Sequence, residues 1–101
     1  MEEFDRLIGV MHKLRRECPW DKEQTLRSLR TYLIEEAYEC LDAMNAAESG
    51  DEAPLIEELG DLLLQIMFQS ELLSEKSKEP VIRKVVVGIT CLLYTSDAAD
   101  E

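Results

Sequence analysis

Basic residues are scarce in this 101-residue chain, and their scarcity restricts the partners it can have. Eleven lysines and arginines stand against 22 aspartates and glutamates, so the net charge is -11. A surface with this excess of acid repels phosphate backbones and anionic lipids, so neither nucleic acid nor a membrane is an expected partner. A ligand that itself carries phosphates would need a divalent cation to neutralise the acids.

Cysteine, histidine and glycine are also rare. The three cysteines, Cys18, Cys40 and Cys91, form no Cys-x-x-Cys pair, so neither a disulfide framework nor a structural zinc site is expected. The single histidine cannot supply the two Glu-x-x-His motifs of a di-iron bundle. The four glycines include no Gly-x-x-x-x-Gly-Lys phosphate loop, and the EF-hand pattern of calcium sensors is missing too.

Long apolar runs are missing as well. No run reaches the roughly 18 residues that a membrane span requires. The acidic start of the chain lacks the apolar stretch of a signal peptide. Together with the cysteine usage, this predicts a cytoplasmic protein.

Hydrophobic periodicity predicts an all-α fold. Apolar side chains recur at helical spacing over residues 3–17, and Pro19 ends that helix. Longer helices are predicted over 25–48, with a short first piece near 25–30, and over 52–78. Gly50 lies in the turn between them, where glycine favours a helix C-terminus. A chain this short buries a modest core, so we expect an antiparallel helical bundle whose core is completed by oligomerisation, as a dimer or a tetramer.

The C-terminal residues differ from the rest. The β-branched stretch 81–89 suits a strand or a buried helix, and residues 95–101 resemble a disordered end. We therefore expect a functional domain over 1–79. Residues 80–101 are expected to form a divergent segment: a fourth helix and then a non-native or disordered tail from about residue 92.

Two pairs of acidic residues stand out in the long helices. Glu36 with Glu39, and Glu58 with Asp61, each have i, i+3 spacing, so each pair shares one helix face. If the helices form an antiparallel hairpin about the turn at residues 48–51, Glu36 lies level with Asp61 and Glu39 with Glu58. Glu36 also falls inside the apolar face of its helix. Carboxylate oxygens gathered in this way are the ligands that Mg²⁺ or Mn²⁺ prefers.

A simpler explanation must be weighed for each acidic pair. In a chain with 22 acids, such spacings arise by chance, and most surface glutamates belong to solvated helix faces. The shared register and the apolar surroundings of Glu36 favour a site for the four residues as a set.

The motifs around these acids resemble the MazG family of nucleoside triphosphate pyrophosphohydrolases. The resemblance covers roughly residues 3–78, and the segments that carry it are Cys18-Pro19-Trp20-Asp21, Gln24-Thr25, Tyr32-Leu33-Ile34-Glu35-Glu36-Ala37-Tyr38-Glu39 and Glu57-Glu58-Leu59-Gly60-Asp61-Leu62-Leu63-Leu64-Gln65. It implies an all-α oligomer of the MazG type that hydrolyses a nucleoside triphosphate to the monophosphate and pyrophosphate with Mg²⁺, for which Mn²⁺ could substitute.

The resemblance also implies roles for single residues. Glu36, Glu39, Glu58 and Asp61 would bind Mg²⁺. Glu35 would either orient the groups that bind the metal or be the base that positions the attacking water. Trp20 is a candidate for stacking on the nucleobase, or else it packs its loop onto the helices. Arg30 could guide phosphates towards the metal or be an ordinary surface charge.

The C-terminus departs from the family pattern, because the basic stretch expected there is missing and no base follows Lys84. Arg83 and Lys84 are the nearest remaining candidates for phosphate contacts, and activity is expected to be impaired. Two alternatives therefore stay open: a catalytically weak helical oligomerisation or interaction module, and an acidic metal-buffering protein.

Overall fold

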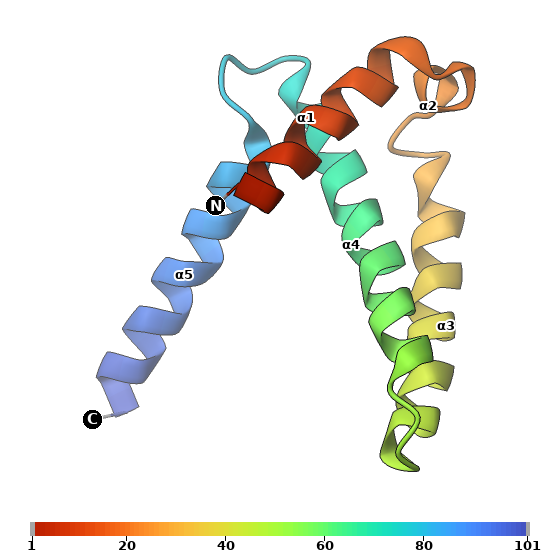
Figure 1. The fold of residues 1–101 in the computed structure, drawn as a ribbon. Coiled ribbons are helices and arrows are strands. Elements are labelled where there is room, and N and C mark those ends of the chain that lie inside the picture. The colour runs from red at the N-terminus through yellow and green to blue at the C-terminus, as the bar shows by residue number, and fades with distance from the viewer. Residues whose placement is uncertain (1, 101) are drawn as a thin grey trace.

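The structure, a computed structural model, describes residues 2–100 and the side chains of residues 2–95. Helices account for nearly all of it, and no strand occurs within residues 2–100, so the predicted all-α fold is confirmed. Figure 1 shows the elements in chain order: α1 (Glu2–Glu17), α2 (Pro19–Glu23), α3 (Leu29–Glu48), α4 (Ala53–Ser74) and α5 (Val81–Asp100).

Helices α3 and α4 form an antiparallel hairpin, the most extensive helix pairing in the molecule (Figure 1). Gly50 lies in the turn with a φ of 103°, a left-handed conformation that glycine adopts without a steric penalty. The amide of Gly50 donates to the carbonyl of Ala47 at 3.0 Å, and the amide of Asp51 donates to Ala46 at 3.0 Å. These two bonds form a Schellman motif, which ends α3 where the sequence predicts its end.

Helix α3 begins later than the sequence pattern predicts, at Leu29 instead of residue 25. The reason is local hydrogen bonding: the amide of Ser28 donates to the Thr25 hydroxyl at 3.1 Å, and the amide of Thr25 donates to the Ser28 hydroxyl at 2.8 Å. Side chains of this kind offer the backbone an alternative to helical bonds. Residues 26–28 therefore form a turn.

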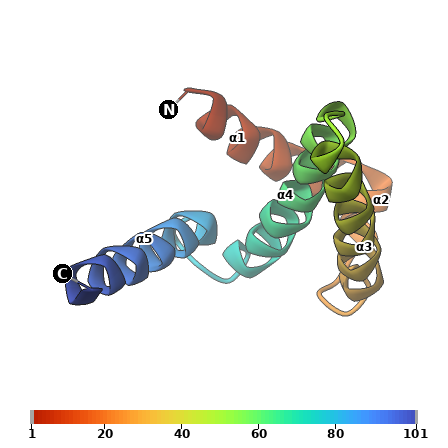
Figure 2. The same ribbon diagram turned by 90° about the horizontal axis from the view of Figure 1, so that it is seen from below.

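A small hydrophobic core lies at the end of the hairpin away from the Gly50 turn. There α1 crosses α4, and the start of α5 packs against it as well (Figures 1 and 2). The core consists of Met11, Leu29, Met67, Phe68 and Ile82, with Phe4, Leu7, Ile8 and Leu72 packed against it. Each helix except α2 contributes to this core.

Arg15 fixes the short helix α2 and the loop after it. Its guanidinium donates to three backbone carbonyls, those of Asp21 at 2.5 Å, Lys22 at 2.9 Å and Gln24 at 3.0 Å. The same group forms an ion pair with Glu75 on the C-terminal side of α4, at 2.5 Å. Arg15 thus satisfies carbonyls that a helix C-terminus leaves without partners and ties this loop to α4.

The β-branched segment after Pro80 forms a helix and not a strand. Helix α5 packs at its start against α4 and then diverges from the hairpin (Figure 2). Ile82 is its one buried residue among Val81–Thr95, so the expectation of a buried helix is wrong for the single chain. The helix continues to Asp100, where composition predicts a disordered end; alanine, present at 98 and 99, has the highest helix propensity.

Many large apolar side chains remain exposed in the single chain. On α4, Leu59, Leu63, Leu64 and Ile66 are exposed. Further exposed apolar residues lie along α5: Val85, Val86, Val87, Ile89, Leu92 and Leu93. Within residues 2–100, no helix is long and apolar enough to cross a membrane.

Candidate metal centre

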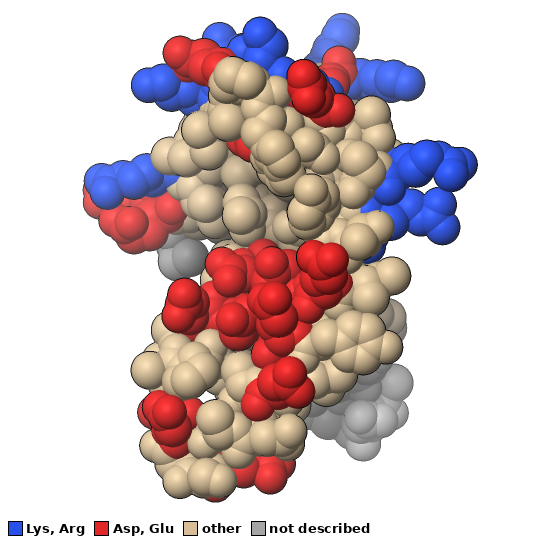
Figure 3. All heavy atoms as spheres, turned by 90° about the vertical axis from the view of Figure 1, so that its right-hand side faces the viewer, with Lys and Arg blue, Asp and Glu red and all other residues tan. Residues whose placement is uncertain are grey.

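Four carboxylates from the two hairpin helices meet at mid-height of α3 and α4. Each of Glu36, Glu39, Glu58 and Asp61 offers one carboxylate oxygen, and these four atoms all lie within 4.8 Å of one another. We call this set the carboxylate cluster. Figure 3 shows acidic side chains gathered into one continuous patch on this face of the molecule, with lysines and arginines above it and at its edge.

The hairpin register explains why these four residues converge. The buried and half-buried positions of α3 form the seam along which this helix packs against α4, and Glu36 is one of them. Glu58 and Asp61 are half-buried on α4, whereas Glu39 is exposed at the edge. One oxygen of Glu36 and one of Glu58 are buried without any hydrogen-bond partner. Acceptors left in this state cost free energy unless a donor or a cation satisfies them.

The electrostatics of the cluster favour a bound cation. Burial raises the pKa of Glu36, and repulsion from Glu39 and Asp61 raises it further. Burial also raises the pKa of Glu58, and Glu39 adds to that shift. Carboxylates so close together exist as charged groups only at a cost, which a proton or a divalent ion offsets.

The donor set fits a hard divalent ion. Opposite ligands of an octahedral Mg²⁺ are about 4.2 Å apart, twice the usual Mg–O distance. The 4.8 Å limit on the cluster oxygens is close enough for small side-chain movements to bring them to this spacing. Carboxylates suit Mg²⁺ and Mn²⁺, whereas zinc and copper favour nitrogen or sulfur ligands. The cluster therefore fits a divalent metal ion.

Trp20 lies at the core end of this face and is 46% exposed. Its ring makes edge contacts with Tyr32, centroids 5.5 Å apart, and with Phe68, centroids 6.0 Å apart. Tyr32 precedes Glu36 by one helical turn, so it lies on the same side of α3. Trp20 therefore packs its loop onto the hairpin and still leaves part of its side chain exposed.

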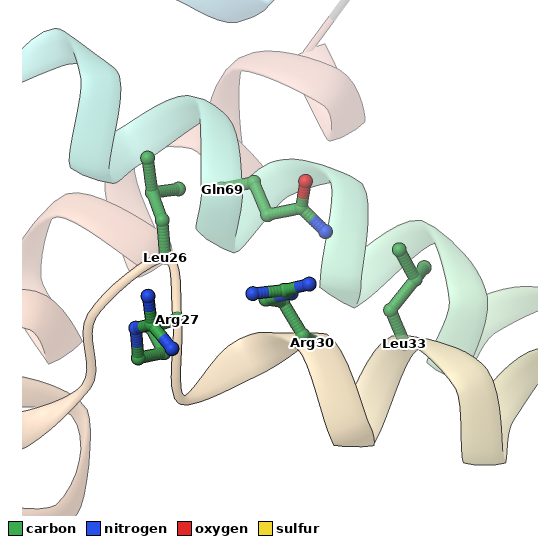
Figure 4. A pocket seen from close by; sticks show the side chains of 5 residues that line it. All are labelled: Leu26, Arg27, Arg30, Leu33 and Gln69. Carbon is green, nitrogen blue, oxygen red and sulfur yellow. The ribbon is translucent and has the colours of Figure 1, made fainter.

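Arg30 lines a hollow of about 390 Å³ between the start of α3 and the C-terminal half of α4. Figure 4 shows the Arg30 guanidinium of α3 pointing into this hollow towards Gln69 of α4, with Arg27 in the turn before α3. The remaining lining side chains are Leu26 and Leu33. Two arginines and no acidic residue line this hollow.

Three other sequence candidates are placed differently. Glu35 is exposed and its carboxylate lies outside the cluster. Arg83 forms an ion pair with Asp5 of α1 at 2.7 Å, and this bond lowers the pKa of Asp5. Lys84 is also on α5, which does not pack against α3. Within one chain, Arg83 and Lys84 are thus not brought to the carboxylate cluster, and their substrate contacts stay a prediction.

One residue of this face was not a sequence candidate. Gln65 is only 6% exposed, and its Oε1 is buried without a hydrogen-bond partner. It follows Asp61 by one turn of α4. The register that places Glu36 level with Asp61 also places Tyr32 level with Gln65, so the sequence already indicated that Gln65 lies near the site. Its lack of a partner was visible only in the structure.

Comparison with known proteins agrees with the carboxylate pattern. Residues 24–90 match the family model described as the MazG nucleotide pyrophosphohydrolase domain. This chain belongs to the MazG family. The match contains all four carboxylates and continues past residue 79 into α5.

Several relatives of this MazG domain are named nucleoside triphosphate pyrophosphohydrolases. It is 49% identical over 73 residues to the nucleoside triphosphate pyrophosphohydrolase of Mycobacterium tuberculosis, covering 72% of this chain and 22% of that protein. It is 44% identical over 81 residues to the Escherichia coli protein of the same name, covering 77% and 30%. The Thermotoga maritima nucleoside triphosphate pyrophosphohydrolase/pyrophosphatase MazG is 44% identical over 85 residues, covering 79% and 32%. The chain thus spans less than a third of these relatives' length.

Proposed function

We propose that this MazG domain hydrolyses a nucleoside triphosphate to the monophosphate and pyrophosphate with Mg²⁺ as cofactor. The observation that carries the proposal is the carboxylate cluster, whose oxygens lie within 4.8 Å of one another and include two buried atoms without partners. The names of the relatives supply the reaction class.

In the proposed site, Glu36, Glu39, Glu58 and Asp61 hold the metal. Bound Mg²⁺ would neutralise the phosphate oxygens and lower the pKa of a coordinated water. Mn²⁺ offers the same preference for oxygen ligands. All four residues lie on α3 or α4, so helix packing and not a loop would set the ligand geometry.

The remaining residues would bind and orient the nucleotide. Glu35, exposed next to Glu36, would accept a proton from the water that attacks the α-phosphorus. Arg30 would contact phosphate oxygens from its hollow. Trp20 would present its open ring surface to the nucleobase. Arg83 and Lys84 would add positive charge only if a second subunit brought α5 to this face.

The test is pyrophosphate release from a panel of eight ribo- and deoxyribonucleoside triphosphates, measured with Mg²⁺ and with EDTA. We expect Mg²⁺-dependent release from the wild type and a loss of at least about 100-fold for Glu39→Gln, a ligand at the edge of the cluster. Glu57→Gln is the matched control, because Glu57 is an exposed acid of α4 outside the cluster. A folded wild type that binds Mg²⁺ and releases no pyrophosphate would contradict the proposal.

A catalytically weak interaction module is the second candidate. The ion pair of Arg83 with Asp5 favours it, since this pair holds Arg83, one of the two basic candidates on α5, against α1. It predicts Mg²⁺ binding without turnover, so the same assay separates the two candidates.

We also propose that the domain works as a homo-oligomer. Several large apolar residues of α4 and α5 are exposed in the single chain, among them Leu59, Leu63, Val87 and Leu92, and exposed apolar surface often marks a protein–protein interface. Light scattering coupled to size-exclusion chromatography distinguishes a dimer from a tetramer. A monomer at micromolar concentration would contradict this part of the proposal.

A further inference from the structure

Gln65 combines two properties that a purely structural residue rarely has. Only 6% of the residue is exposed, and its Oε1 has no hydrogen-bond partner. A buried carbonyl without a donor costs free energy relative to a paired one. Most buried polar side chains are paired. Another buried polar residue of α4, Ser70, follows this rule, since its hydroxyl donates to the carbonyl of Ile66 at 2.8 Å.

The position of Gln65 links the two parts of the candidate site. Asp61, Gln65 and Phe68 recur at i, i+4 and i+7, so they share one face of α4. Asp61 belongs to the carboxylate cluster, and Phe68 contacts Trp20. Gln65 therefore lies one turn, about 5.4 Å along the axis, from the metal-binding end and about one turn from the aromatic end.

The chemistry of an unpaired acceptor narrows what can bind there. Oε1 needs a donor, and the phosphate oxygens of a nucleotide at neutral pH offer none. In any nucleotide the sugar connects the phosphates to the base. If the phosphates lie at the carboxylate cluster and the base at Trp20, the sugar falls level with Gln65, and its hydroxyl groups are donors.

We infer that Gln65 is a substrate-contacting residue whose Oε1 accepts a hydrogen bond from a sugar hydroxyl of the nucleotide. This inference rests on the proposed function, because it places the phosphates at the carboxylate cluster. It assigns to Gln65 the recognition of the sugar.

The experiment measures binding without turnover. Mg²⁺ complexes of α,β-methylene adenosine triphosphate and of its 2′-deoxy and 2′,3′-dideoxy forms are titrated into the wild type, Gln65→Met and Ser70→Ala. Methionine keeps the length of glutamine and removes its polar atoms. Ser70→Ala is the control for loss of a buried polar group on the same helix. Mg²⁺ alone is titrated into each protein as well.

We expect the wild type to bind the dideoxy form about tenfold more weakly than the ribo form, a difference of about 1.4 kcal/mol. Gln65→Met should bind the ribo form about tenfold more weakly than the wild type does and should lose this discrimination between sugars. Its affinity for Mg²⁺ alone should be unchanged, and its melting temperature should not fall, because it removes an unpaired buried acceptor. Ser70→Ala should discriminate as the wild type does.

Three results would overturn the inference while leaving the proposed function intact. The first is equal affinity of the wild type for the ribo, deoxy and dideoxy nucleotides. The second is a preference between these sugars that is unchanged in Gln65→Met. The third is weaker binding of Mg²⁺ alone by Gln65→Met, which would assign the amide to a metal-bound water. The comparison of sugars in the wild type does not depend on the folding of any variant. If the wild type binds Mg²⁺ but none of the three nucleotides, the proposed function and the inference both fail.

Discussion

Removing one charge from the carboxylate cluster should stabilise the metal-free protein and weaken its response to metal. We consider Glu36→Gln, because Glu36 is half-buried in the α3 seam with one oxygen that has no partner. Two unit charges 4.8 Å apart repel each other by about 0.9 kcal/mol in water and about 3.5 kcal/mol at an effective dielectric constant of 20.

The site is partly open to solvent, so screening brings the net effect towards the lower value, about 1 kcal/mol. For a domain of this size, 1 kcal/mol corresponds to a rise of about 4–8 °C in melting temperature. We therefore expect Glu36→Gln in EDTA to melt about 4–8 °C above the wild type. The assay is thermal unfolding followed by circular dichroism, at one protein concentration for all variants because an oligomer melts in a concentration-dependent way.

Saturating Mg²⁺ should reverse the order of the two proteins. At 100 times its dissociation constant, a ligand adds about 2.7 kcal/mol to the stability of the state that binds it. The wild type should gain this stabilisation, and Glu36→Gln, which lacks one ligand, should gain much less. Glu57→Gln, outside the cluster, should follow the wild type in both conditions. A variant that melts below the wild type in EDTA would refute the repulsion argument.

The same reasoning fixes the pH dependence. The pKa of Glu36 is raised above its ordinary value of 4.5, so the folded state binds the proton more tightly than the unfolded state does. Its contribution to stability is therefore present at low pH and is lost as the pH rises through the raised pKa. In EDTA, the gap between Glu36→Gln and the wild type should be small near pH 4 and should widen towards pH 7.

Further predictions concern the loop, the turn and the metal. Arg15→Ala should lower the free energy of unfolding in urea by about 1–3 kcal/mol, because three backbone carbonyls lose their charged donor. Arg16 is exposed, so Arg16→Ala should change this free energy by less than about 0.5 kcal/mol. Equal effects of the two substitutions would refute the role of Arg15. Gly50→Ala should cost about 1–2 kcal/mol at a φ of 103°, whereas Gly60→Ala, inside α4 with open space around it, should be neutral or stabilising. Calorimetric affinity for Mg²⁺ should fall as the pH is lowered, because protons compete for the carboxylate cluster; a flat profile would argue against carboxylate ligands.

Local pattern was enough to predict the hairpin and the cluster. The positions of the helices follow from apolar spacing, and the turn follows from Gly50, whose left-handed conformation ends α3. Once a hairpin about that turn is assumed, register alone pairs Glu36 with Asp61 and Glu39 with Glu58. These features depend only on residues close in sequence or on residues paired by the antiparallel register of the hairpin. The sequence alone therefore determined them.

Long-range contacts could not be predicted in this way. The partner of Arg83 is Asp5, 78 residues away, and nothing in the sequence around Arg83 indicates this partner. The direction of α5 away from the hairpin depends on how Ile82 packs into the core, and periodicity carries no information about such packing. The sequence therefore placed Arg83 beside the phosphates, while the structure places it against α1.

The candidate site divides along the same line. The sequence determined which carboxylates share a helix face, because a helix repeats every 3.6 residues wherever it lies. Only the tertiary structure decided how deeply each side chain is buried and which polar atoms lack a partner. That is why Glu36 and Asp61 could be named from spacing, while the contact of Trp20 with Phe68 and the unpaired Oε1 of Gln65 emerged only from the packed molecule.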